Sequence, residues 1–300
     1  MSELRPYPKP SYPQRVKTAA HYLLPQLAVT RAAGWLADRR WGVLTTLAVK
    51  TFAACYKIDL AEAEKSRAGD YASFNEFFIR TLKPGARPID ANPDTLCLPA
   101  DGRVSEAGAI ENGRLIQAKG HSFTTLELLA GDETLAAQFS DGLFLTTYLS
   151  PRDYHRVHMP CAATLRRMVY VPGELYSVNP FLARHIPNLF ARNERLICVF
   201  DTAFGSMVQI LVGATVTASI STTWAGIINP PRPQTVLQWL YPAEGADTVK
   251  LEKGQGMGAF RLGSTVINLF PHNSIRLADT LRPGAQTRMG GLLGERMQAV

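Results

Sequence analysis

The chain has 300 residues, of which 46% are hydrophobic, and a formal net charge of +7 at pH 7. This length and apolar content suffice for one large packed domain, or for a domain with an appendage. The four cysteines lie far apart without a CxxC pair, which argues against a zinc site or a disulfide framework and suits a reducing compartment. We expect neither a signal peptide nor a transmembrane segment, because no run reaches the roughly 18 apolar residues of a membrane span.

The positive charge is concentrated near the N-terminus. Residues 1–58 hold nine Lys or Arg and two acidic residues, so their net charge equals that of the whole chain. Leucines, tryptophans and a phenylalanine alternate with these cations at helical spacing. Basic amphipathic helices with tryptophans suit an anionic membrane surface better than a nucleic-acid groove. The alternative is a set of helices that pack on their own core and leave their charges in water.

The first predicted unit is helical. Residues 1–16 contain four prolines and are expected to form a loose arm. Residues 17–66 are predicted to form two or three helices, with breaks at Pro25 and Gly34. Together, residues 1–70 are expected to be an N-terminal helical membrane-binding region.

Residues 71–300 form the second predicted unit, a largely antiparallel β domain. It opens with the capping-box pattern Ser73-Phe74-Asn75-Glu76, followed by an apolar stripe that includes Phe77 and Phe78. After residue 85 the sequence changes to short β-rich runs separated by Gly, Pro and Asn. The clearest predicted strands are Leu143–Leu149, Leu165–Val171, Arg195–Asp201, Met207–Ser221 and Ala259–Phe270. Helical signal is limited to about Thr125–Leu129 and a turn near 181–190, so the expected fold class is α+β.

The most informative short segment is Leu262-Gly263-Ser264-Thr265. A serine that follows glycine between strand-like residues can attack its own preceding peptide bond, since its hydroxyl reaches the Gly263 carbonyl through a five-membered ring. Gly263 has no Cβ and can adopt the strained backbone angles of such a ring. The product is an ester, and its elimination would convert Ser264 into a pyruvoyl group, a ketone beside an amide. Taken alone, however, Gly-Ser in a strand is ordinary.

Two of the six histidines lie in the segment Ser150–Pro160, which is dense in polar residues. The serine, proline and aspartate at its start are typical of a helix N-terminus, which predicts one helical turn through about His155 and an extended stretch after it. Such a switch would let His155 and His158 approach one site, whereas on a plain strand they would face opposite sides. Asp101 precedes a glycine in the pattern of a tight turn.

Six sequence blocks, in this order, form a very specific set. They are Phe74-Asn75-Glu76-Phe77-Phe78, Pro99-Ala100-Asp101-Gly102, Leu149–Pro160, Pro187–Arg195, Gln209–Ala214 and Leu262-Gly263-Ser264-Thr265. On these blocks the chain resembles the bacterial, proteobacterial-type phosphatidylserine decarboxylase family, from about Tyr22 to Arg288.

The resemblance implies self-cleavage between Gly263 and Ser264 into residues 1–263 (β chain) and 264–300 (α chain), which would remain together as a heterodimer. It also implies a covalent pyruvoyl cofactor derived from Ser264, and conversion of phosphatidylserine to phosphatidylethanolamine and CO2 through a Schiff base to that group. For cleavage, it implies an Asp–His–Ser triad of Asp101, His158 and Ser264.

A different task is expected of His155. After CO2 leaves, a carbanion must be protonated, and an imidazole near neutral pKa suits this step. The alternative is a structural histidine bonded to backbone. Arg152 and Arg156 are candidates for contact with the lipid phosphate by proximity only, with surface ion pairs as the alternative. No metal site is expected.

Two other functions remain open. A serine hydrolase or protease would use Asp101, His158 and Ser264 on an external substrate, although the sequence around Ser264 lacks the Gly-x-Ser-x-Gly elbow. A non-enzymatic membrane-surface binding module would show lipid affinity without chain cleavage. The basic N-terminus favours a lipid substrate and a peripheral location on the cytoplasmic face of the cell (inner) membrane, with no nucleic-acid partner and with homo-oligomerisation left open.

Overall fold

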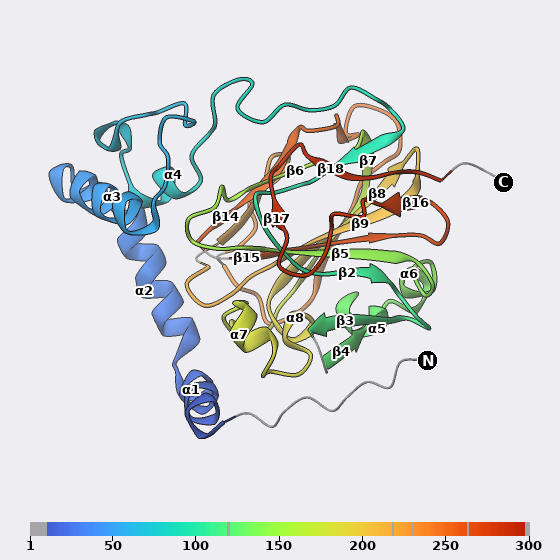
Figure 1. The fold of residues 1–300 in the computed structure, drawn as a ribbon, viewed down its shortest axis with the longest axis horizontal. Helices are drawn as coiled ribbons and strands as arrows, with labels where there is room; N and C mark the ends of the chain where they lie inside the picture. The colour runs from blue at the N-terminus through green and yellow to red at the C-terminus, as the bar shows by residue number, and fades with distance from the viewer. Residues whose placement is uncertain (1–10, 119–120, 218, 230, 263, 298–300) are drawn as a thin grey trace.

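The computed structural model describes residues 11–118, 121–217, 219–229, 231–262 and 264–297 (Figure 1). Its helices are α1 (Tyr12–Leu23), α2 (Gln26–Asp38), α3 (Val43–Tyr56), the 3-10 helix η1 (Ala68–Asp70), α4 (Phe74–Phe78), α5 (Thr125–Leu128), α6 (Glu133–Ala137), α7 (Pro180–Ala183) and α8 (Leu189–Arg192). Its strands are β1 (Thr95–Cys97), β2 (Gly102–Ala109), β3 (Arg114–Ala118), β4 (His121–Thr124), β5 (Leu143–Leu149), β6 (Arg156–His158), β7 (Ala163–Val171), β8 (Arg195–Thr202), β9 (Gly205–Val212), β10 (Ser219–Thr222), β11 (Gly226–Ile227), β12 (Leu237–Leu240), β13 (Lys250–Leu251), β14 (Gly256–Arg261), β15 (Ser264–Phe270), β16 (Ile275–Leu277), β17 (Gln286–Thr287) and β18 (Leu292–Arg296). The predicted α+β class is confirmed, because the long helices precede a domain made mostly of strands.

A nine-stranded antiparallel sheet forms the centre of the β domain. Its strand order is β12-β7-β8-β9-β15-β5-β2-β17, and β13 also pairs with β7. Three smaller sheets accompany it, with the orders β11-β10-β14-β6, β1-β18-β16 and β3-β4. Because β15 lies between β9 and β5, both of its edges are hydrogen-bonded along most of its length.

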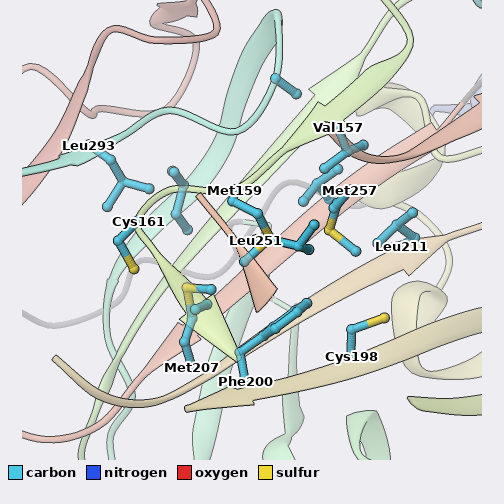
Figure 2. Close-up of a cluster of buried hydrophobic side chains, with 14 of the residues drawn as sticks. Val157, Met159, Cys161, Cys198, Phe200, Met207, Leu211, Leu251, Met257 and Leu293 are labelled. Carbon is cyan, nitrogen blue, oxygen red and sulfur yellow. The ribbon is translucent and has the colours of Figure 1, made fainter. Parts of the chain in front are cut away.

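The faces of β15 are covered as well, and all seven of its residues are buried. Side chains alternate between the faces of a strand, and accordingly Val266 belongs to one hydrophobic cluster and Ile267 to another. The first cluster lies between the large sheet and two of the smaller ones, those of β14 and of β18, and it includes Val157 and Met257 (Figure 2). The second cluster lies on the opposite face and takes a leucine from each of the short helices α5, α6, α7 and α8.

The long N-terminal helices lie along one side of the β domain (Figure 1). The ring of Phe52 in α3 contacts Phe74 and Phe77 in α4, with centroid distances of 5.0 and 6.0 Å. At the end of α2, the Asp38 carboxylate accepts a hydrogen bond from Asn75 Nδ2 at 2.8 Å. Many large apolar side chains of α1 to α3 are nevertheless exposed: Tyr12, Tyr22, Leu23, Trp35, Leu36, Val43, Leu44, Leu47 and Tyr56. Within the described ranges, no helix combines the length and the apolar character needed to cross a membrane.

The predicted helices need one correction. The break at Pro25 is confirmed, because α1 ends at Leu23 and α2 begins at Gln26. The break at Gly34 is wrong, because this buried glycine lies inside α2. An internal glycine costs a helix only about 1 kcal/mol relative to alanine, which packing against the β domain offsets. The Ser73 cap is confirmed, since its Oγ accepts a hydrogen bond from Glu76 N at 3.2 Å.

Most predicted strands are present, and two are divided. Residues 207–221 contain parts of β9 and β10, and residues 259–270 contain the end of β14 and all of β15. The helical turn predicted after Ser150 is wrong. The Asp153 carboxylate accepts hydrogen bonds from the N–H and Oγ of Ser150, at 2.7 and 2.6 Å, and this pair closes a turn that leads directly into β6.

The burial of β15 generates a stability prediction. Replacing the fully buried Ile267 by alanine should lower the free energy of unfolding by about 2–5 kcal/mol, because it removes buried methyl groups and leaves a cavity. The matched control, Ile116→Ala, removes the same atoms from a side chain that is 52% exposed and should stay within about 0.5 kcal/mol of the parent. Thermal unfolding measures both, and equal melting temperatures for the two variants would contradict the central place of β15.

Candidate active site

Ser264 is the first residue of β15 and is completely buried. Its backbone pairs with Leu149, the last residue of β5. Because Ser264 and Val266 are two residues apart on one strand, their side chains point to the same face, toward the first hydrophobic cluster. Within the described part of the chain, the Ser264 hydroxyl has no hydrogen-bond partner. An unpaired buried hydroxyl costs about 1–3 kcal/mol, so its presence here calls for a functional explanation.

The backbone just before Ser264 is strained. Leu262 has a φ of 79°, in a region that a branched side chain rarely adopts. Such a conformation costs on the order of 1–3 kcal/mol and persists only where the surrounding structure enforces it. Gly263, where the sequence predicted the strain, lies outside the described residues. The observed strain therefore lies one residue before the predicted scissile bond.

The loop between β5 and β6, residues 150–155, is bonded to the strands on either side of the connection between β14 and β15. Its first end, Leu149, pairs with Ser264, and near its other end the His155 carbonyl accepts a hydrogen bond from Phe260 N at 3.1 Å. The loop residues 150–155 are thereby tied to both sides of the 261–263 segment. This is how the tertiary structure brings the histidine segment beside the predicted cleavage site.

His155 is fully buried next to α4, with its ring centroid 4.1 Å from that of Phe78. Its Nδ1 donates to the Asp153 carbonyl at 2.8 Å, because a carbonyl oxygen can only accept. Its Nε2 is buried without a partner among the described residues. Burial lowers the pKa of His155 to about 3, so at neutral pH the ring is uncharged and Nε2 carries a lone pair.

His158 is the last residue of β6 and has a different environment. Its Nδ1 donates to the Gly254 carbonyl at 2.8 Å, which leaves Nε2 as an acceptor for the Tyr154 hydroxyl at 3.1 Å. Burial lowers the pKa of His158, and burial raises the pKa of Tyr154 to about 12. Both groups are therefore neutral near pH 7. His158 is a base, and the lone pair on its Nε2 accepts a hydrogen bond from the weakly acidic hydroxyl of Tyr154.

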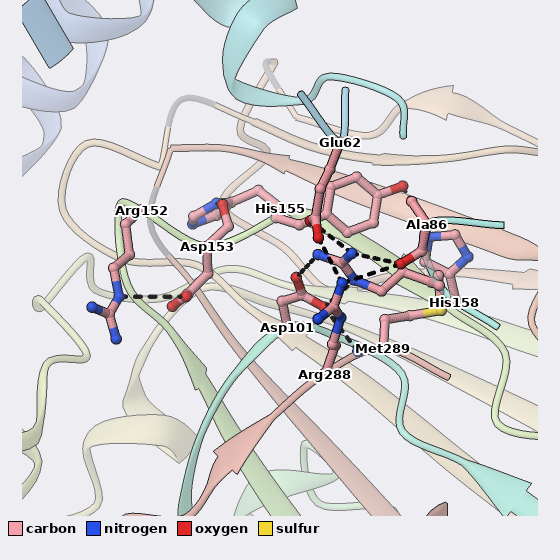
Figure 3. A network of polar contacts seen from close by, with 11 residues as sticks. Glu62, Ala86, Asp101, Arg152, Asp153, His155, His158, Arg288 and Met289 are labelled. Carbon is pink, nitrogen blue, oxygen red and sulfur yellow. Dashed lines mark hydrogen bonds and ion pairs between the residues drawn. The ribbon is translucent and has the colours of Figure 1, made fainter. Parts of the chain in front are cut away.

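Asp101 lies beside this pair in a network of charged groups (Figure 3). Its carboxylate accepts hydrogen bonds from Arg87 Nε at 3.1 Å and from Met289 N at 2.8 Å. Arg87 also donates to Glu62 at 2.8 Å. The negative charge of Asp101 raises the pKa of His158 against the effect of burial, although no hydrogen bond joins their side chains in the described structure.

The sequence-predicted residues thus fall into two groups. Asp101 and His158 share one network, and His158 lines a pocket of about 440 Å³ together with Tyr154 and Arg87. Ser264 and His155 do not line that pocket, and the two imidazole rings point to opposite sides in Figure 3. Among the described residues, Ser264 forms a hydrogen bond with neither histidine.

Sequence reasoning missed two members of this network and left open whether Arg152 and Arg156 contact the lipid phosphate; of these two, Arg156 lines the same pocket as His158. Tyr154 lies inside the histidine segment but carried no chemical signal by itself, and Arg87 is distant in sequence from every other member. Arg156 Nε donates to the Ile79 carbonyl at 2.7 Å, which ties it to the helical side of the site. Arg152 is exposed and lies 3.8 Å from the neighbouring Asp153 carboxylate, a contact of the ordinary surface kind.

The residues present fit a prosthetic group made from the chain itself. The hydroxyl of Ser264 is buried, has no partner among the described residues and follows strained backbone, and these three features suit an internal attack on the Gly263 carbonyl. Across the described residues, no group of three His, Cys, Asp or Glu side chains is placed to hold a metal ion.

Comparison with known proteins agrees with this chemistry. A family model described as phosphatidylserine decarboxylase matches residues 74–295, and a second model, described as PSD, matches residues 16–57. The chain is 64% identical to the phosphatidylserine decarboxylase proenzyme of Glaesserella parasuis, over 98% of this chain and 99% of that protein. It is 61% identical to the proenzyme of Haemophilus ducreyi, over 96% and 97% of the two chains, and 63% identical to that of Haemophilus influenzae, over 94% and 97%. The chain therefore belongs to the phosphatidylserine decarboxylase family.

Proposed function

We propose that this protein is synthesised as a proenzyme, cleaves itself before Ser264, and decarboxylates phosphatidylserine to phosphatidylethanolamine and CO2. The observation that carries the proposal is the buried, unpaired hydroxyl of Ser264 behind the strained Leu262. A serine hydrolase must present its serine to an external substrate, and a serine with no exposed surface does not suit that task. The same burial suits an attack on the adjacent peptide bond.

In the proposed cleavage, the Ser264 oxygen bonds to the Gly263 carbonyl carbon and its proton goes to a base. The C–N bond then breaks as the nitrogen takes that proton, which leaves an ester between residues 263 and 264. Removal of the Ser264 α-proton expels the Gly263 carboxylate, and water then releases ammonia from the remaining group. His158 is the proposed base for these transfers, with Asp101 stabilising its positive charge. Because Tyr154 occupies its lone pair in this structure, His158 must exchange that partner for Ser264 before it acts.

Once formed, the pyruvoyl group supplies an electron sink for the bond that breaks when CO2 leaves. His155 is the proposed proton donor to the decarboxylated carbon, and its buried Nε2 has no competing partner among the described residues. With a pKa lowered to about 3 it is not charged at neutral pH. The substrate carboxylate would raise this pKa, since a nearby anion stabilises the imidazolium. Nε2 would then take a proton from solvent while the carboxylate is bound and pass it to the carbon once CO2 has left.

The N-terminal helices are the proposed membrane-binding region. Two family models match on either side of residue 70, which supports a division into residues 1–70 and 71–300. The exposed apolar side chains of α1 to α3, together with the net positive charge of residues 1–58, suit insertion at an anionic lipid surface. The proposed location is peripheral, on the cytoplasmic face of the cell membrane, where the two cleavage chains remain together.

Self-processing gives a direct prediction. The purified protein should consist of residues 1–263 and 264–300, and the smaller chain should be lighter than its sequence mass by one ammonia. Intact-mass spectrometry measures both. Ser264→Ala should remain a single folded chain, whereas the control Ser274→Ala should be processed like the parent. A full-length, uncleaved chain that still decarboxylates phosphatidylserine would contradict the proposal.

The two histidines are expected to separate in their effects. Asp101→Asn and His158→Ala should block or slow fragment formation, and Tyr154→Phe should alter its rate, because Tyr154 occupies the His158 lone pair. His155→Ala should permit cleavage but reduce CO2 release by about 10²-fold or more, the usual contribution of a positioned proton donor. Electrophoresis and CO2 release, followed in the same samples, make the comparison. If His155→Ala arrests cleavage and His158→Ala does not, the roles are reversed.

Membrane binding can be tested without removing residues that support the core. The double variant Leu44→Glu with Leu47→Glu should lose most co-sedimentation with anionic vesicles, because both side chains are exposed on α3. The matched control, Val236→Glu with Leu240→Glu, changes two exposed side chains outside the N-terminal helices and should sediment like the parent. Equal sedimentation of all three proteins would place the membrane contact elsewhere.

A further inference from the structure

A second pocket, of about 540 Å³, lies between α2 and the pair of strands β10 and β14. Its walls include Arg31 and Trp35 of α2, Ser219 of β10 and Arg261 of β14. Figure 1 shows α2 passing beside the end of the sheet that carries β14. This pocket shares no lining residue with the one at His158. Its Arg261 is three residues before Ser264, and three extended residues span at most about 11 Å.

Two buried donors belong to residues that line this pocket. Ser219 is 2% exposed and lies directly opposite Arg261 in the pairing of β10 with β14. The hydroxyl of Ser219 and the Nε of Arg261 are both buried without a hydrogen-bond partner in the described structure. Native proteins rarely leave buried donors unpaired. Two such donors on directly paired residues that line one pocket suit a ligand with acceptor oxygens.

The charges around the pocket indicate an anionic ligand. Arg232 donates to Glu194 at 2.9 Å, and Arg261 donates to Asp38 at 3.2 Å, so these two arginines are partly neutralised by the protein. Arg31 forms no hydrogen bond or ion pair with another described residue, although it lines the same pocket. Guanidinium groups match the oxygens of phosphate in geometry and charge.

Part of the pocket wall is apolar and exposed. Trp35 is 55% exposed and Ile227 is 48% exposed, and both line the pocket. Trp35 lies on α2, one of the helices with exposed apolar side chains that we assign to the membrane surface. A pocket lined by cationic and hydroxyl donors and by exposed apolar side chains suits an amphiphile with an anionic group.

We propose that this pocket binds the phosphodiester of the phosphatidylserine headgroup, with Arg31, Ser219 and Arg261 as donors and Trp35 beside the glycerol and acyl chains. The proposal rests on the proposed function, since the serine end of the headgroup would then extend from Arg261 toward Ser264. α2 consequently has two tasks, because it lies on the membrane and forms one wall of the substrate site.

The test uses the cleaved enzyme with short-chain phosphatidylserine dispersed in detergent, so that membrane binding does not limit the rate. Arg31→Gln and Ser219→Ala should each raise KM by about tenfold, the usual effect of losing one hydrogen bond to a charged group, and leave kcat and fragment formation unchanged. Ser219→Ala should keep the parental melting temperature, because the deleted hydroxyl has no hydrogen-bond partner among the described residues. The controls Arg276→Gln and Ser274→Ala, outside both pockets, should leave KM unchanged.

A binding measurement separates this proposal from the proposed function. In uncleaved Ser264→Ala protein, the ³¹P resonance of short-chain phosphatidylserine should shift on binding, and Arg31→Gln in the same background should weaken that binding about tenfold. Short-chain phosphatidylglycerol should compete, because it carries the same phosphodiester, and diacylglycerol should not. Parental affinity in Arg31→Gln, or competition by diacylglycerol, would overturn the phosphate site even if the enzyme decarboxylates. If no CO2 is released but the ³¹P shift and its loss are observed, the proposed function fails and the phosphate site stands.

Discussion

The burial of β15 on all sides is the constraint on which the rest of the structure depends. Its edges are paired with β5 and β9, and its two faces contribute to two separate hydrophobic clusters. A strand held in this way cannot shift in register without moving Val266 and Ile267 to the wrong faces. Ser264 is therefore fixed at the start of the strand, in a buried position where its hydroxyl has no hydrogen-bond partner among the described residues. The strain at Leu262 can persist for the same reason, since the strands on both sides of it are tied into sheets.

Burial also determines the electrostatics of the site. Both histidines are neutral near pH 7 because burial lowers their pKa values, so each offers a lone pair and not a charge. Their surroundings then distinguish them. His158 bonds to Tyr154 and lies near the carboxylate of Asp101, whereas His155 is enclosed beside Phe78, and its Nε2 has no partner in the described structure. Two chemically identical side chains three residues apart are thereby suited to different proton transfers, because the intervening strand turns them to opposite sides.

The N-terminal helices are connected to this chemistry and are not a detached anchor. Asp38, at the end of α2, accepts from Asn75 in α4 and forms an ion pair with Arg261, which leads into the segment before Ser264. α2 also forms one wall of the second pocket. In the proposed arrangement, α2 connects the lipid surface to the reacting residue, because Leu36 is exposed on this helix while Arg31 and Trp35 line the pocket. If both proposals hold, docking on the membrane and delivery of the headgroup are the same event.

The sequence by itself determined the local features, because these depend on side chains close together in the chain. The concentration of cations near the N-terminus, the Ser73 cap, the exact span of β5 and the Gly-Ser pair all follow from neighbouring residues. The break expected at Gly34 failed because packing on the β domain outweighs a small helix penalty, and the turn expected after Ser150 failed because the Asp153 carboxylate captures both Ser150 donors. Only the tertiary structure placed Arg87 on Asp101, Tyr154 on His158 and Arg261 opposite Ser219. Some of those contacts join residues far apart in sequence, and one depends on the direction in which a side chain points. Sheet register and burial decide which residues meet and where their side chains point.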